Sequence, residues 1–140
     1  MTVRKLMLKD WPYAGTLYLE LTEGGAGASK SQFETILAHP GTEIYGKEVQ
    51  GGITAMATLH ILPNMTYGGR SYALVENVVT AASARRLGYG KEVLNHLPTR
   101  TAESGCYKIM LLTGQARSAR GFYKAADFNA DEKWGMIGRL

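Results

Sequence analysis

The spacing of hydrophobic residues changes several times along the chain, and each change marks a predicted strand or helix. Ser71–Thr80 has no Gly or Pro and is rich in β-branched and apolar residues, which predicts a strand. The tail from Leu87 to Gly105 predicts a helix. Pro98 within it predicts a kink or a break, because proline removes a backbone donor and clashes with the preceding turn. Strands in series followed by a strand, a helix and a strand are typical of a mixed α/β domain.

Shorter elements surround this unit. Val3–Leu8 predicts a first strand, and we expect Asp10 to cap the helix that follows, with Pro12 in its first turn. A Gly/Ala/Ser tract ends that helix at Gly24. The remaining predicted elements are a helix from Ser31 to Ala38, a hairpin made of Glu43–Val49 and Ile53–Leu62, a buried strand over Tyr107–Thr113 with both faces covered, a short helix over Ser118–Ala126, and one or two closing strands formed by Phe128 and by Trp134–Ile137.

The turn that joins the central strand to its helix carries candidate binding chemistry. It reads Arg85-Arg86-Leu87-Gly88-Tyr89-Gly90. A helix that starts there directs unpaired backbone N–H groups and the positive end of its dipole into the turn, which favours phosphate or pyrophosphate. The glycines allow a ligand to approach the backbone because they lack a β-carbon. Taken alone, the hexapeptide is equally compatible with an ordinary loop.

Glu76 is a charged residue within the otherwise apolar central strand. A carboxylate in a buried strand is costly unless it is paired, protonated or exposed to a cleft. Glu76 is therefore a candidate general base. The alternative is a structural carboxylate that pairs with a basic side chain.

Together these motifs resemble the GNAT acetyltransferase superfamily. Its signature is an R/Q-x-x-G-x-G/A turn after a central strand, then a helix, with a Phe-Tyr pair further on. This chain has Arg85, Gly88 and Gly90 in those places and Phe122-Tyr123 downstream. The resemblance implies an α/β GNAT fold in a single domain covering residues 1–140. Its sheet would be mixed and mostly antiparallel, with a parallel central pair splayed to admit acetyl-CoA and helices on both faces.

The resemblance also implies roles for individual residues. Glu76 would take the proton of the acceptor amine, and Tyr123 would protonate the departing thiolate. Tyr123 could instead be ordinary core packing. No metal is needed. The residues expected to bind acetyl-CoA through backbone groups or positive charge are Val78, Val79, Thr80, Arg85, Arg86, Leu87, Gly88, Tyr89, Gly90 and Lys91.

Two stretches, Val75–Val79 and Gly105–Ile109, resemble the glucosamine-6-phosphate N-acetyltransferase branch of this family. Leu112 and Asn77 stand where that branch has acidic residues, so this substrate is not assigned. Asp127 replaces the family glycine before Phe128, and it is expected to alter the turn because a non-glycine residue resists a positive φ.

Composition narrows the class of protein. With 45% hydrophobic and 20% charged residues in 140, the chain has the composition of a soluble globular domain. A single cysteine, Cys106, and an N-terminus without a long apolar run lead us to expect a cytoplasmic protein that does not associate with membranes. His39, His60 and His96 are scattered, and no residue at a telling spacing points to catalysis.

The net charge of +4 does not require a nucleic-acid partner. The densest positive group lies at the proposed phosphate turn, where a small polyanionic ligand accounts for it. The expected partner is a small-molecule amine, and a homodimer is common in the family. The expected function is acetyl transfer from acetyl-CoA to a primary amine. A protein amine as acceptor, or a non-catalytic CoA-binding module, remain alternatives.

Overall fold

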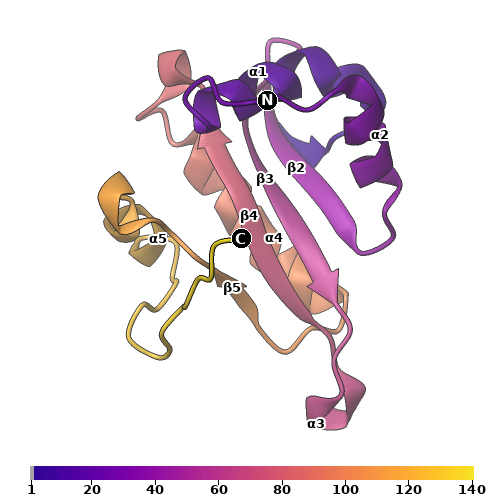
Figure 1. The fold of residues 1–140 in the computed structure, drawn as a ribbon, viewed down its shortest axis with the longest axis vertical. Helices are drawn as coiled ribbons and strands as arrows, with labels where there is room; N and C mark the ends of the chain where they lie inside the picture. Colours follow the sequence, from indigo (N-terminus) through magenta and orange to yellow (C-terminus); the bar gives the residue numbers. More distant parts are fainter. Residues whose placement is uncertain (1) are drawn as a thin grey trace.

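A computed structural model describes residues 2–140 and shows one five-stranded mixed sheet with helices on both faces (Figure 1). The strands follow the order β1-β2-β3-β4-β5, and only the β4–β5 pair is parallel. The strands are β1 (Thr2–Lys5), β2 (Thr42–Val49), β3 (Gly52–Leu62), β4 (Tyr72–Thr80) and β5 (Ile109–Leu111). The helices are α1 (Trp11–Leu21), α2 (Lys30–Ala38), α3 (Thr66–Gly69), α4 (Tyr89–Glu103) and α5 (Arg120–Lys124), with 3₁₀ turns at Leu8–Asp10, Ala82–Ala84 and Gln115–Arg117. The predicted fold class is confirmed.

Each face of the sheet carries its own apolar core. On one face, Ala57, Leu59 and Val75 pack with Leu94 and Leu97 of α4, which crosses behind the sheet in Figure 1. The other face packs under α1 and α2. Its buried residues are Leu6, Ala14, Leu17, Phe33, Ile44, Ile53, Met56 and Val79.

A bulge in β4 interrupts the alternation of its side chains. Glu76 lies opposite Thr58 and Val79 lies opposite Met56, so Asn77 and Val78 together face one residue of β3. Asn77 has a φ of 53°, which a non-glycine residue adopts at some cost and which asparagine tolerates better than most. The extra residue shifts the alternation by one. Val75 therefore packs on the α4 face, whereas Val79 packs on the α1–α2 face.

The parallel pairing of β4 with β5 is short. It joins Ala73 to Ile109, Leu74 to Met110 and Val75 to Leu111, and it stops one residue before Glu76. Beyond Val75 the two chain segments diverge, and the second half of β4 has a ladder partner only in β3. This is the predicted splay of the parallel pair.

Helix α4 passes through Pro98 without the predicted break. Pro98 lies on the exposed side of the helix, whereas Val93, Leu94 and Leu97 are fully buried against the sheet. Burial of three large apolar side chains offsets the backbone hydrogen bond that proline removes. The helix starts at Tyr89, two residues later than predicted, with Gly88 as its N-cap.

Two predictions about the C-terminal third are wrong. The strand predicted at Tyr107–Thr113 is only three residues long, and Met110 and Leu112 are exposed, so its two faces are not both covered. Residues 125–140 contain no strand in the structure, and Trp134 is 91% exposed. The charged run from Asp131 to Lys133 and the glycines on either side of Met136-Ile137 leave too short an apolar stretch for a strand.

Asp10 precedes α1 as predicted, but its side chain does not cap that helix. Its carboxylate accepts hydrogen bonds of 2.8 Å from the Arg4 guanidinium and from the backbone N–H of Met7. The clearest side-chain cap is at α2. There Ser29 and Gln32 each accept a hydrogen bond from the other's backbone N–H.

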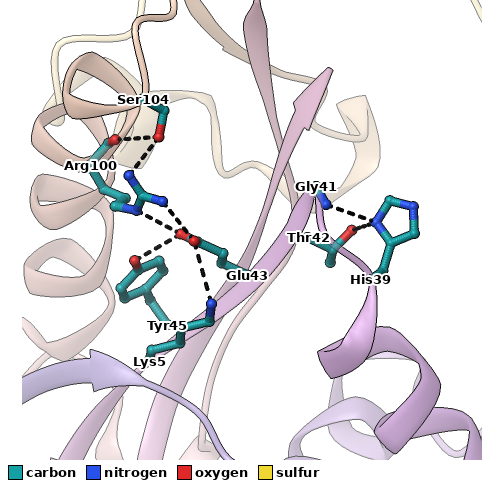
Figure 2. Close-up of polar contacts among 8 residues, drawn as sticks. All are labelled: Lys5, His39, Gly41, Thr42, Glu43, Tyr45, Arg100 and Ser104. Atoms are coloured by element: carbon teal, nitrogen blue, oxygen red, sulfur yellow. Dashed lines mark hydrogen bonds and ion pairs between the residues drawn. The ribbon is translucent and has the colours of Figure 1, made fainter. Parts of the chain in front are cut away.

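An ion-pair network fastens the C-terminal half of α4 to the sheet (Figure 2). Arg100 donates two hydrogen bonds of 2.8 Å to the Glu43 carboxylate on β2, which also accepts from the Tyr45 hydroxyl at 2.9 Å. Lys5 of β1 lies 3.4 Å from the same carboxylate. The Arg100 hydrogen bonds, with help from the Tyr45 hydrogen bond and the positive charge of Lys5, lower the pKa of Glu43 to about 2.

Candidate active site

A cleft of about 1210 Å³ opens where β4 and β5 diverge. The C-terminal half of β4, the first turn of α4, the chain after β5, helix α5 and the end of α1 form its walls. Its lining is made by residues 20–23, 75–80, 84–86, 88–91, 111–114, 116, 117, 119, 122 and 123. The splay of the parallel pair is thus the origin of the cleft.

The first turn of α4 presents free backbone donors to this cleft. Gly88 has a φ of 83° and offers no side-chain cap, and the first intrahelical bond runs from the Glu92 N–H to the Gly88 carbonyl at 3.0 Å. The N–H groups of Tyr89, Gly90 and Lys91 precede that bond and therefore have no intrahelical acceptor. A β-carbon on Gly88 would meet no atom within 4 Å, so the turn leaves room for a ligand. These features fit a pyrophosphate.

All but one of the predicted cofactor residues line the cleft. Leu87 is the exception: it is 59% exposed and lies outside the lining. Gly90, unlike the exposed Gly88, is buried, and a glycine is needed there for a different reason. Its β-carbon would lie 2.6 Å from Oγ1 of Thr80 and 3.4 Å from the Phe122 ring, so a glycine is needed for α4 to pack closely on β4.

Glu76 is half-buried and lines the cleft at the start of the splay. Within residues 2–140 its carboxylate has no hydrogen-bond or ion-pair partner among the described contacts. The pairing with a basic side chain, which was the structural alternative, is therefore not seen. The carboxylate is placed to accept a proton from a molecule in the cleft.

Tyr123 lies on α5, on the wall opposite β4. Its ring packs edge-on against Phe122 at 5.2 Å and Phe128 at 6.4 Å, so it fills the core as well as lining the cleft. Burial raises the pKa of the Tyr123 phenol, and the negative charge of Glu76 also raises it, whereas Arg117 lowers it. A raised pKa keeps the phenol protonated.

Two contacts that the sequence did not reveal hold the end of α1 against the cleft. The Glu20 carboxylate accepts a hydrogen bond of 2.8 Å from the Ala82 N–H, and Arg117 donates one of 3.1 Å to the Leu21 carbonyl. These pairs are 62 and 96 residues apart in the chain, so no local pattern predicts them. They hold the end of α1 in place as one wall of the cleft.

A second pocket of about 580 Å³ lies on the α1–α2 face of the sheet. It shares Thr22 and Asn77 with the cleft, so the two spaces meet at the β4 bulge. Its other walls come from α1, α2, the segment between these helices, and β3.

Comparison with known proteins decides the family. The sequence pattern of the acetyltransferase (GNAT) family matches residues 3–128. The chain belongs to this family. GNAT acetyltransferases use acetyl-CoA, which agrees with the pyrophosphate-compatible turn of α4. The Asp127 turn keeps a positive φ, 65°, without the family glycine.

Curated and solved relatives agree with this assignment. Glucosamine 6-phosphate N-acetyltransferase of Trypanosoma brucei brucei is 33% identical over 92 residues, which are 66% of this chain and 61% of that protein. A candidate acetyltransferase from Agrobacterium tumefaciens str. C58 has a TM-score of 0.91 at 33% identity, over 99% of this chain and 100% of its own. The crystal structure of a Trypanosoma brucei acetyltransferase has a TM-score of 0.79 at 27% identity, over 99% of both chains.

Two further features concern residues 2–140. None of their helices is long and apolar enough to cross a membrane. No group of three or more His, Cys, Asp or Glu side chains in this part of the chain is arranged to hold a metal ion.

Proposed function

We propose that this protein transfers an acetyl group from acetyl-CoA to the primary amine of a small molecule, by direct attack of the amine on the thioester. One observation carries the proposal. The carboxylate of Glu76 and the phenol of Tyr123 line the same cleft as the uncapped first turn of α4. A binding element for pyrophosphate and two groups suited to proton transfer thus share one space.

The binding half of the proposal rests on backbone groups. The N–H groups of Tyr89, Gly90 and Lys91 would hold the pyrophosphate, with the side chains of Arg85 and Arg86 adding positive charge. The backbone of Val78–Thr80 lines the splay and is available to the pantetheine arm. Acetyl-CoA supplies the activated thioester carbonyl.

The catalytic half assigns one proton transfer to each of two side chains. Glu76 accepts the proton of the attacking amine, directly or through a water, because no partner within residues 2–140 occupies its carboxylate. Tyr123 donates its proton to the departing thiolate, since its raised pKa keeps the phenol protonated at neutral pH. Both side chains lie at the walls of the cleft and neither requires a metal.

Two measurements on the full chain test the proposal. Calorimetry should detect CoA binding, and a thiol reagent should detect CoA release when the protein is given acetyl-CoA with a panel of small primary amines and, separately, with a lysine-containing peptide. Binding without release on any amine would favour a non-catalytic CoA module. Release only with a lysine-containing peptide would favour a protein acceptor, and absence of CoA binding would refute the proposal altogether.

A further inference from the structure

The second pocket is walled by aromatic and uncharged side chains. Trp11 and Phe33 lie 5.4 Å apart, ring centre to ring centre, and Tyr18, Ile36, Thr58 and His60 complete its main surfaces. In the part of the chain that the structure describes, no Asp, Glu, Lys or Arg lines it. A molecule that enters this pocket exchanges water for apolar surface and finds no charge to neutralise its own.

The pocket adjoins the place where chemistry is proposed. Asn77, at the bulge, lines both the pocket and the cleft, and Thr58 of the pocket lies opposite Glu76 in the β3–β4 ladder. A molecule bound in the pocket can therefore extend its amine past the bulge toward Glu76. His60 lies two residues further along β3, about 7 Å from the Thr58–Glu76 pair at the usual strand rise.

A chain of hydrogen bonds determines which nitrogen of His60 is free. The Gly41 N–H donates to Nδ1 of His39 at 3.3 Å, so that nitrogen carries no proton (Figure 2). The Thr42 hydroxyl, 3.0 Å from the same nitrogen, must donate its hydrogen to it.

Having used its hydrogen, the Thr42 oxygen can only accept from Nδ1 of His60, which is also 3.0 Å away. In the neutral form of the His60 ring, this hydrogen bond places the proton on Nδ1. Its remaining nitrogen, Nε2, has a lone pair and is the one left for a molecule in the pocket that His60 lines.

We infer that this pocket accepts a primary amine with a flat, uncharged, apolar body and a hydrogen-bond donor at its far end, which Nε2 of His60 accepts. The inference rests on the proposed function and names its substrate class. A phenol or an indole borne on an ethylamine chain has this shape, with the hydrogen-bond donor on the ring and the amine at the end of the chain. A sugar phosphate does not, because its dianion would enter a pocket without a cationic side chain.

Three probes and two variants test the inference. Tyramine and 2-phenylethylamine differ only in the phenol hydroxyl, and glucosamine 6-phosphate is the charged competitor. With acetyl-CoA saturating, kcat/KM for tyramine should exceed that for 2-phenylethylamine by at least tenfold, and glucosamine 6-phosphate should be poorer than both. The tenfold preference should be a difference in amine KM more than in kcat, because the hydroxyl lies far from the reacting nitrogen.

His60→Asn and His60→Gln form a matched pair of variants. The Asn amide can still donate to Thr42 but has nothing at the Nε2 position, so the preference for tyramine should disappear. The Gln side chain reaches the Nε2 position with a carbonyl oxygen, so a preference of severalfold should survive. Both variants should keep the parent KM for acetyl-CoA, which shows that they are folded.

The outcomes separate the inference from the proposed function. Efficient acetylation of glucosamine 6-phosphate, or equal use of tyramine and 2-phenylethylamine by the parent, overturns the inference and leaves acetyl transfer intact. If no amine is acetylated, calorimetry decides: tyramine binding that His60→Asn abolishes upholds the pocket while acetyl transfer fails, and no tyramine binding overturns the inference.

Discussion

A β-carbon on Gly90 would lie 2.6 Å from the side-chain oxygen of Thr80, so α4 packs against β4 at this point of the cleft too closely for any side chain on residue 90. Gly90→Ala should lower the melting temperature, with an overpacking cost of about 1–3 kcal/mol, although alanine is otherwise the better helix residue. In a Thr80→Ala background the oxygen is absent, and Gly90→Ala should then be neutral or stabilising. Thermal unfolding of the four proteins in this cycle measures the coupling. Equal effects of Gly90→Ala in both backgrounds would contradict the contact.

Gly88 has a positive φ, and no atom lies within 4 Å of the position that a β-carbon would take there. Gly88→Val should weaken CoA binding at least tenfold, or about 1.4 kcal/mol, because the branched side chain would project into the turn. Gly105 is a matched control, since its φ is 76° and a β-carbon there also meets nothing within 4 Å, but it follows the other end of α4. Gly105→Val should cost similar stability without changing CoA affinity. Calorimetry on both folded variants checks this, and equal CoA affinity of Gly88→Val and the parent would exclude the turn as the pyrophosphate site.

Glu76→Gln tests the proposed base. It should lower kcat more than it raises the KM for acetyl-CoA, and the acidic limb of the pH–rate profile should flatten or shift because that limb reports the essential base. Glu103→Gln, at the exposed C-terminal end of α4, serves as the control and should leave the profile unchanged. A parental profile in Glu76→Gln would transfer proton removal to solvent or to the substrate.

Tyr123→Phe separates chemistry from packing. The ring and its contacts with Phe122 and Phe128 remain, so stability and acetyl-CoA affinity should change little. Loss of the proton donor should lower kcat about a hundredfold, within the usual range for general acid catalysis. Tyr72→Phe, which removes a hydroxyl at the far end of β4, is the control. A Tyr123→Phe enzyme within threefold of the parent kcat, at saturating substrates, would remove the acid role.

The Glu43–Arg100 pair predicts a specific acid dependence of stability. Because hydrogen bonds from Arg100 lower the pKa of Glu43 from 4.5 to about 2, the ionised carboxylate stabilises the folded state above pH 4.5. That contribution, on the order of 3 kcal/mol, is lost as the pH falls from 4.5 toward 2. Denaturant unfolding across this interval should therefore show a falling free energy of unfolding that Glu43→Gln largely removes. An acid limb as steep in Glu43→Gln as in Glu103→Gln would show that other carboxylates are responsible.

The sequence by itself determined the parts of the site whose signals are local. The strand before the turn, the glycine at the start of α4 and the carboxylate of Glu76 are encoded within a few residues, whereas Tyr123 was identified through the resemblance to the family Phe-Tyr pair. The periodicity of helices and strands, and a glycine at the N-terminus of a helix, depend on neighbouring residues only. These features could therefore be predicted from the sequence.

Only the tertiary structure decided the features that join distant segments. The bulge at Asn77 depends on register with β3, and the cleft exists because pairing with β5 stops at Val75. Pro98 stays helical because the sheet buries its neighbours, and the His39–Thr42–His60 chain joins a helix end to two strands. Each of these features depends on contacts between segments that are far apart in the sequence. The sequence shows the local conformational preference, such as the unfavourable proline in a helix, but it does not show the distant contact that outweighs it.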